Sequence, residues 1–285
     1  MPAIVIKFLV ILFDVLPNNI LSRLFGKWAS IEFPSFLQTI FNKGFCFFCK
    51  IDLRDCGRKA SDFKTVNLLF TRKVDMTIRP IEDGFPSPCD GKLLQFADSY
   101  RGQAVQAKTL SYDLNILCDT KSTNFGWYST IYLSPKDYHR VHCPIDGELI
   151  QATHIPGKLF PVNDIFLPFK KDIFAENERV VFQIFNPKLK ANLYLIMVGA
   201  YNVGSVTSKF FPSLETNISG KSKSIIKAPA SAKIKRGEEL ATFQLGSTVV
   251  LAFERGFDQV FKMEETGKAR TVKMGQKLLE FNQKP

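Results

Sequence analysis

Apolar residues in the first fifty positions recur at the spacing of amphipathic helices. Residues 3–16 form a nearly continuous apolar run that contains Lys7 and Asp14 and ends at Pro17. Two further segments repeat a period of three to four residues, at Ile20, Leu21, Leu24, Phe25 and Trp28, and after Pro34 at Phe36, Leu37, Ile40, Phe41, Phe45 and Phe48. Basic residues fall on other faces or nearby: Arg23, Lys27, Lys43 and Lys50. The pattern predicts helices with an apolar and a basic side, as at a bilayer interface.

The first apolar run is too short to cross a bilayer, which takes about 20 residues. No small-residue cleavage site of the Ala-x-Ala kind follows it, so we do not expect removal by a signal peptidase. We expect this region, residues 1–58, to associate with a membrane surface. A competing interpretation is that the helices cover the core of the domain that follows.

From about residue 60 the apolar stretches become short and are separated by Gly, Pro, Asn and Asp. Runs rich in β-branched and aromatic residues predict strands. They are residues 127–133, 180–185, 193–198 and 249–253, with a last short one at 271–273. Helical periodicity is weak here, which favours an antiparallel sheet over a parallel α/β fold. We therefore predict an α+β protein, with a mainly antiparallel, sandwich-like or barrel-like body at residues 59–285.

The net charge and the distribution of aromatic residues indicate which kind of partner the protein binds. The chain has 285 residues, a formal net charge of +11, and 27 Phe against 7 Tyr and 2 Trp. Such a charge is typical of proteins that bind nucleic acid or anionic membranes. The lysines are spread along the chain and no nucleic-acid-binding module is recognisable, whereas the phenylalanines cluster at the N-terminus. We expect an anionic membrane and no nucleic acid.

The cysteines predict neither a disulfide scaffold nor a metal site. They are Cys46, Cys49, Cys56, Cys89, Cys118 and Cys143, too few and too scattered for a disulfide-built secreted fold. Cys46 and Cys49 form a Cys-x-x-Cys pair inside an apolar run, with no second pair to complete a tetrahedral site. We interpret them as reduced, packed thiols.

Three histidines lie within residues 139–154. His139 and His142 form a His-x-x-His pair, but residues three apart on a strand point to opposite faces, which disfavours joint metal ligation. They are either structural histidines in the turn before Pro144 or acid–base groups, since histidine exchanges protons near neutral pH. We expect no metal.

Two further motifs complete the candidate chemistry. Asp90-Gly91 is either a hairpin turn or the source of an acid that orients a histidine. Gly246-Ser247 is followed by a predicted buried strand, a place where backbone strain can be stored. Asp, His and Ser form a charge relay if the fold brings them together. Local chemistry leaves the function open between a serine hydrolase and a less usual enzyme.

Several segments together resemble the phosphatidylserine decarboxylase family, whose members use a pyruvoyl group. The similarity runs from about residue 65 to the C-terminus in the family's order, with Cys89 in place of the usual alanine and Tyr201 in place of a smaller residue. The matching segments are 67–72 (Asn-Leu-Leu-Phe-Thr-Arg), 87–91 (Ser-Pro-Cys-Asp-Gly), 138–142 (Tyr-His-Arg-Val-His), 157–163 (Gly-Lys-Leu-Phe-Pro-Val-Asn), 177–180 (Asn-Glu-Arg-Val), 198–205 (Val-Gly-Ala-Tyr-Asn-Val-Gly-Ser) and 245–248 (Leu-Gly-Ser-Thr).

The resemblance implies a self-cleaving proenzyme. Asp90 would orient His142, His142 would deprotonate Ser247, and the Ser247 hydroxyl would attack the Gly246 carbonyl. The products would be a long chain, residues 1–246, and a short chain, residues 247–285, that begins with a pyruvoyl group made from Ser247. This cofactor would form a Schiff base with the amine of phosphatidylserine, and His139 is the candidate proton donor in decarboxylation to phosphatidylethanolamine.

The expected partners are phosphatidylserine in an anionic membrane and the two chains of one precursor, with a homodimer left open. The expected location is peripheral, on the cytoplasmic face of a bacterial cell membrane. Two alternatives remain. One is a membrane-associated hydrolase with an intact Ser247, and the other is a non-enzymatic lipid-binding module in which Gly246-Ser247 is an ordinary turn.

Overall fold

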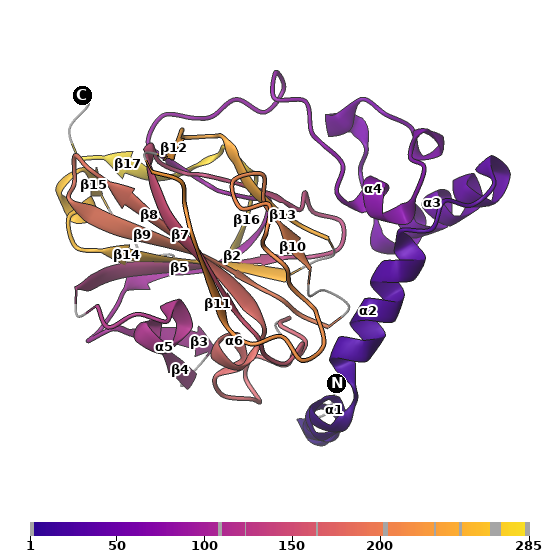
Figure 1. The fold of residues 1–285 in the computed structure, drawn as a ribbon, viewed down its shortest axis with the longest axis horizontal. Helices are drawn as coiled ribbons and strands as arrows, with labels where there is room; N and C mark the ends of the chain where they lie inside the picture. Colours follow the sequence, from indigo (N-terminus) through magenta and orange to yellow (C-terminus); the bar gives the residue numbers. More distant parts are fainter. Residues whose placement is uncertain are drawn as a thin grey trace.

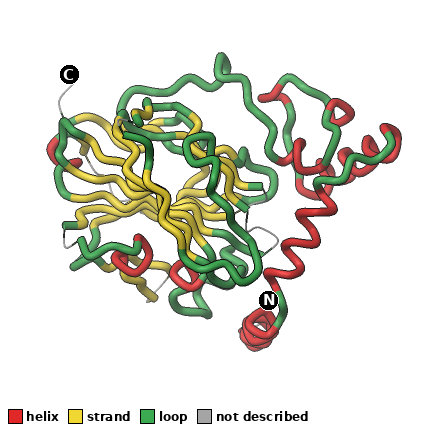
Figure 2. The backbone as a smooth tube through the Cα atoms, viewed as in Figure 1, coloured by secondary structure: helices red, strands yellow, loops and turns green. Residues whose placement is uncertain are grey.

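The computed structural model describes residues 3–107, 110–122, 124–163, 165–201, 205–230, 232–244, 247–262 and 269–282, with the backbone alone for Ser247. Figure 1 shows a β body with a helical arm at one side, and Figure 2 shows that the longer helices belong to the arm. The predicted class is confirmed: strands pair antiparallel, and helices precede them. The boundary near residue 58 stays a prediction.

Three helices form the N-terminal arm: α1 (Ala3–Val15), α2 (Asn18–Ala29) and α3 (Ser35–Cys49). Shorter helices connect the arm to the body or cover the sheets. They are η1 (Arg54–Cys56), η2 (Ala60–Asp62), α4 (Val66–Phe70), α5 (Leu114–Cys118), α6 (Ile173–Glu176) and η3 (Phe257–Gln259). The start of α4 is fixed by Thr65, whose hydroxyl accepts a hydrogen bond from the Leu68 N–H.

The body is built on one large antiparallel sheet. Its strand order is β11-β7-β8-β9-β14-β5-β2-β16, and β12 also pairs with β7. Smaller sheets have the orders β1-β17-β15, β10-β13-β6 and β3-β4. The strands are β1 (Phe85–Pro86), β2 (Gly91–Asp98), β3 (Gln103–Ala107), β4 (Leu110–Asp113), β5 (Phe125–Leu133), β6 (Arg140–His142), β7 (Gly147–Ile155), β8 (Arg179–Asn186), β9 (Ala191–Val198), β10 (Val206–Thr207), β11 (Ser224–Lys227), β12 (Lys233–Ile234), β13 (Glu239–Phe243), β14 (Ser247–Glu254), β15 (Phe261–Lys262), β16 (Arg270–Val272) and β17 (Lys277–Phe281).

The central strands are buried on both faces. Along β14, Val249, Leu251 and Phe253 belong to one core cluster, whereas Val250 and Ala252 belong to another. Side chains alternate between the faces of a strand, so a sheet covered on both sides produces a continuous apolar run. The runs predicted as strands at 127–133, 180–185, 193–198 and 249–253 are confirmed as parts of β5, β8, β9 and β14.

The helices of the arm bury several polar side chains and expose many large apolar ones. Polar side chains on α2 and α3 are buried, namely Asn18, Ser22, Gln38 and Asn42. Large apolar side chains of the arm are exposed, namely Ile4, Phe8, Ile11, Val15, Ile20, Leu24, Phe36, Ile40, Phe47 and Phe48. Gln38 and Asn42 are hydrogen-bonded: the Gln38 amide donates to Asn42 Oδ1, and the Asn42 amide donates to the Ala60 and Phe63 carbonyls, each at 2.8 Å.

The arm also touches the body through apolar and charged groups. Phe13 of α1 packs edge-on against Phe160 and Phe166, and Asp14 pairs with Lys158 at 3.0 Å. Both interpretations of the arm therefore have a structural counterpart, since it covers part of the core and exposes an apolar side. Among the described helices none is long and apolar enough to cross a membrane alone, while α1 and α2 together meet the length and composition criteria with a 78° bend between them.

Candidate active site

The two candidate histidines lie on either side of Arg140 and Val141, at β6 and the turn that enters it. His139 is fully buried, and its ring lies 3.9 Å from that of Phe70, centroid to centroid. Its Nδ1 lies 2.8 Å from the Asp137 carbonyl oxygen. A carbonyl only accepts, so Nδ1 carries the proton. Nε2 is buried and has no hydrogen-bond partner in the described part of the chain.

The environment keeps His139 neutral. Burial, together with the charge of Arg72, lowers the pKa of His139 to about 3, although the hydrogen bond to Asp137 acts in the opposite direction. With the proton on Nδ1, the lone pair of Nε2 is available. Nε2 is therefore the ring nitrogen of His139 whose lone pair no described residue engages.

His142 has both ring nitrogens engaged. Nδ1 donates to the Gly237 carbonyl at 2.7 Å, so Nε2 accepts from the Tyr138 hydroxyl at 2.9 Å. Burial lowers the pKa of His142 as well. Neither Tyr138 nor Gly237 was expected from the sequence as a partner of His142. Tyr138 stands four residues before it, but only the turn into β6 brings the hydroxyl back to the ring.

Asp90 is buried at the start of β2 and is surrounded by donors. Its carboxylate accepts from Arg79 Nη1 at 2.6 Å, the Met274 N–H at 2.8 Å and Lys273 Nζ at 3.2 Å. The described residues show no hydrogen bond between Asp90 and His142. Their segments nevertheless adjoin, because the His142 N–H donates to the Pro88 carbonyl at 2.8 Å.

The hairpin alternative for Asp90-Gly91 is wrong. β1 pairs with β17, whereas β2 pairs with β5 and β16, so no hairpin joins β1 to β2. Gly91 is required for another reason: a Cβ at this position would collide with the Tyr132 carbonyl oxygen across the sheet.

The sheet register brings Ser247 to the end of the sheet where Asp90 lies. Lys92 of β2 pairs with Tyr132 of β5, and Tyr132 pairs on its other edge with Thr248 of β14. Lys92, Tyr132 and Thr248 thus lie side by side across the sheet. Because β2 and β14 are both antiparallel to β5, they run in the same direction, and Asp90 and Ser247 come just before this row. Leu245 and Gly246 lie outside the described residues, as does the side chain of Ser247.

The chain on each side of residues 245–246 lies near the turn that holds His139. On the N-terminal side, the Phe243 N–H donates to the His139 carbonyl at 3.0 Å. On the C-terminal side, the Ser247 backbone pairs with Leu133, where β5 ends and the chain turns toward His139. The topology thus gathers Ser247, both histidines and Asp90 in one region, while the roles predicted for them stay predictions.

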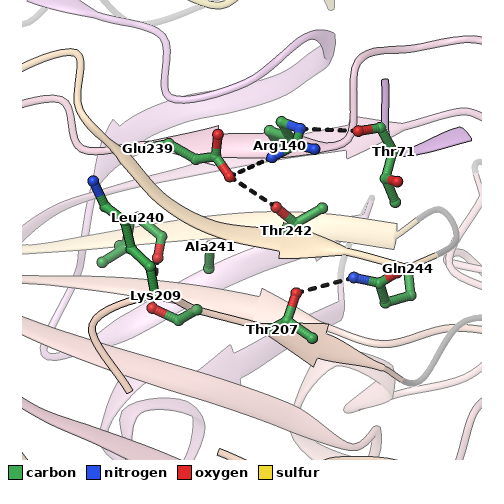
Figure 3. Close-up of a pocket in the computed structure, with 10 residues that line it drawn as sticks. Thr71, Arg140, Thr207, Lys209, Glu239, Leu240, Ala241, Thr242 and Gln244 are labelled. Carbon is green, nitrogen blue, oxygen red and sulfur yellow. Dashed lines mark hydrogen bonds and ion pairs between the residues drawn. The ribbon is translucent and has the colours of Figure 1, made fainter. Parts of the chain in front are cut away.

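A polar cavity of about 330 Å³ lies along β13 beside the same segment (Figure 3). Arg140 Nη1 pairs with Glu239 at 2.6 Å, and Arg140 Nε donates to the Thr71 carbonyl at 2.9 Å. Gln244, the last described residue before the predicted cut, donates to the Thr207 hydroxyl at 2.9 Å. The wall therefore holds an Arg140–Glu239 ion pair, and its second cation, Lys209, pairs with Glu238 at 2.8 Å.

Metal ligands do not cluster in the parts of the chain that the structure describes: no group of three or more His, Cys, Asp or Glu could hold an ion there. All six cysteines are free thiols. Burial raises the pKa of Cys46 and Cys49, which keeps both thiols protonated.

Comparison with known proteins identifies close relatives. Residues 66–280 match the family model of phosphatidylserine decarboxylase. The chain is 36% identical over 246 residues to the phosphatidylserine decarboxylase proenzyme of Campylobacter jejuni, covering 82% of this chain and 90% of the relative. It is 34% identical over 281 residues to that of Idiomarina loihiensis, covering 94% of each, and 35% identical over 272 residues to that of Helicobacter pylori strain Shi470, covering 93% and 98%.

Proposed function

Because the chain belongs to the phosphatidylserine decarboxylase family, we propose that it cuts itself between Gly246 and Ser247 and then converts phosphatidylserine to phosphatidylethanolamine and CO₂. The observation that carries the proposal is the family match over residues 66–280, which includes both histidines, Asp90 and the Gly246-Ser247 step. The relatives are named proenzymes, which supports maturation by cleavage.

Self-cleavage needs a nucleophile, a base and a peptide bond in the right place. The Ser247 hydroxyl gives its proton to a histidine and attacks the Gly246 carbonyl carbon; the C–N bond breaks, the nitrogen takes a proton, and an ester remains. Loss of the Ser247 Cα proton and cleavage of its Cβ–O bond free Gly246 as a carboxylate and leave dehydroalanine. Addition of water and loss of ammonia then leave a ketone at residue 247.

We assign the cleavage base to His142, with Asp90 acting from the adjoining segment, and the later proton transfer to His139. The unpartnered Nε2 of the neutral His139 supports a role in moving a proton. His142 first has to release Tyr138 from Nε2 before it can accept a proton there.

A pyruvoyl group at residue 247 would supply the electron sink that decarboxylation requires and that no ordinary side chain offers. The chain fits such a group. Ser247 starts β14, which pairs on both edges, with β5 and β9, so the new N-terminus would stay in the sheet after the cut. The buried lone pair of His139 and the dry surroundings of β14 suit proton transfer without competing water.

The arm supports action on a lipid in a bilayer. Besides the apolar side chains that pack on the body, it leaves a row of large apolar side chains exposed, more than a helix that merely covers a core would. The net charge of +11 favours an anionic surface. We place the enzyme peripherally on the cytoplasmic face of a bacterial cell membrane, with the arm against the lipid.

Denatured intact mass tests the central claim. Active protein should give two fragments that meet between Gly246 and Ser247, the smaller of 39 residues (285 − 246) with a blocked, borohydride-reducible N-terminus. Ser247→Ala should stay whole, whereas Ser224→Ala on the edge strand β11 should cleave normally. A single 32.3 kDa chain from an active preparation would overturn the proposal. Reaction of that chain with a fluorophosphonate would favour the hydrolase, and lipid binding without turnover the binding module.

A further inference from the structure

A second cavity, of about 610 Å³, lies between the base of the helical arm and β6. Its described walls come from η1, η2, α4, the loop after α4, and Arg140. Five of these side chains are basic and two are acidic: Arg58, Lys64, Arg72, Lys73 and Arg140 against Asp62 and Asp75. The cavity is therefore positively charged.

Arg72 is the buried cation of this cavity, with 6% of its surface exposed. Nη2 donates to the carbonyls of Lys136 and Asp137, at 2.8 and 3.4 Å. Nη1 is buried and has no hydrogen-bond partner among the described residues, and the ion pairs found there include none for Arg72. Asp90 acts on Arg72 only through space, without a direct ion pair. A buried guanidinium without a paired carboxylate is costly, so a ligand that brings a negative charge is favoured.

The two carboxylates of the wall accept hydrogen bonds from residues two or three positions away in their own turns. Asp62 accepts from the Lys59 N–H, and Asp75 from the N–H and hydroxyl of Thr77. Arg140 is already paired with Glu239. Lys64 pairs with Glu32 at 3.6 Å, and Arg58 donates to the Asp62 carbonyl and lies over the Phe63 ring. The buried charge left for a ligand is therefore that of Arg72, with the exposed Lys73 next to it in the chain.

We propose that this cavity binds a phosphate group, held at Arg72 and Lys73, and that the phosphate is the diester of a phospholipid. The free Nη1 group of Arg72 can donate to a phosphate oxygen, an acceptor that guanidinium groups favour. Leu68 lines the cavity with 49% of its surface exposed, and the lining helix η1 follows soon after the exposed Phe47 and Phe48 of α3. A lipid anchored by the arm would thus present its headgroup here.

The cavity adjoins the candidate active site. Arg72 Nη2 and His139 Nδ1 both donate to the Asp137 carbonyl, so the phosphate site lies one carbonyl away from that histidine. That the bound diester belongs to the substrate rests on the proposed function; that the cavity binds a phosphate does not.

Binding and turnover are therefore measured separately on the full chain. Dihexanoyl-phosphatidylglycerol, a soluble diester that is not decarboxylated, and inorganic phosphate serve as probes in calorimetric titrations. We expect the diester to bind more tightly than inorganic phosphate, and Arg72→Gln to weaken diester binding about tenfold or more. Lys73→Gln, at an exposed position, should weaken it severalfold, and more so at low salt.

The matched control is Arg255→Gln, which removes one exposed positive charge beyond the far end of β14. It should leave diester binding unchanged. If Arg72→Gln does not fold, Lys73→Gln carries the test. Diester affinity unchanged in Lys73→Gln and in any folded Arg72 variant would overturn the proposal, and inorganic phosphate binding as tightly as the diester would overturn the lipid assignment.

Turnover of dihexanoyl-phosphatidylserine separates this inference from the proposed function. Arg72-dependent diester binding without any decarboxylation would support the phosphate site and contradict the proposed function. Decarboxylation by a protein whose diester affinity does not change in the Arg72 and Lys73 variants would support the proposed function and contradict the phosphate site.

Discussion

At the scale of single residues, proton positions define what each histidine can do. His139 holds its proton on Nδ1 against Asp137 and keeps Nε2 free, whereas His142 uses both nitrogens, with Gly237 and Tyr138. The difference follows from the turn at residues 134–139, which buries one ring against Phe70 and leaves the other beside a hydroxyl. Two histidines three residues apart thus differ in whether a ring nitrogen is free to exchange a proton.

Alanine variants test this division of work. His142→Ala and Asp90→Ala should leave the precursor uncut, because the base or the group behind it is lost. His139→Ala should still be cut, while its decarboxylation rate falls about 10²- to 10⁴-fold, the usual worth of acid–base catalysis. Cleavage is followed by denatured mass and decarboxylation by CO₂ release. If His139→Ala blocks cleavage instead, the base is His139, whose Nε2 is the free nitrogen.

The buried neutral state of His139 has a consequence for stability. Burial, with the Arg72 charge, lowers its pKa from 6.5 to about 3. Between these values the unfolded chain binds the additional proton, so the stability contributed by neutral His139 is complete above pH 6.5 and is lost as pH falls toward 3. The slope is at most about 1.4 kcal/mol per pH unit.

The comparison of Ser247→Ala with Ser247→Ala/His139→Phe isolates this effect in an uncut chain. Phe preserves an aromatic ring against Phe70 but cannot take up a proton. Urea unfolding should show a shallower loss of stability below pH 6.5 in the double variant. Parallel pH profiles for the two proteins would contradict the assignment.

At the scale of elements, strands were predictable where burial on both faces left one continuous apolar run, as at 193–198 and 249–253. The helical period of the arm was also readable. The side that meets the body was not, because it mixes apolar residues such as Phe13 and Phe45 with polar ones such as Gln38 and Asn42. The partners of His142 were not predictable. Gly237 lies 95 residues away, and only the pairing of β6 with β13 brings it near.

Asn42 tests whether the polar side of α3 holds the arm in place. It is fully buried, and its amide donates to the carbonyls of Ala60 and Phe63. Asn42→Leu removes both donors, and each carbonyl left unsatisfied costs about 1–3 kcal/mol. Thermal unfolding should therefore occur at a lower temperature. Ile40→Gln, on the exposed side of the same helix, should change it little; equal effects would mean that the two sides are not distinct.

At the scale of the whole molecule, charge and apolar surface combine at the arm. The chain carries a net charge of +11, and Phe47 and Phe48 at the end of α3 are 78% and 82% exposed. Charge attracts the protein to an anionic bilayer over the Debye length, whereas insertion of apolar side chains acts only on contact. The two contributions should therefore separate in a salt series.

Co-sedimentation with vesicles measures both. Binding to phosphatidylglycerol vesicles should exceed binding to phosphatidylcholine vesicles at low salt, and a residual affinity should persist at high salt. Phe47→Gln/Phe48→Gln should lower that residual affinity about tenfold or more, because two large apolar side chains no longer enter the lipid. The matched control is Ile116→Gln/Ile225→Gln, which removes two exposed apolar side chains from the β body without changing the charge. If the control weakens binding as much as the arm variant, the membrane-facing surface is not the arm. If salt abolishes binding of the wild type completely, attraction is electrostatic alone and the exposed side of the arm has another partner.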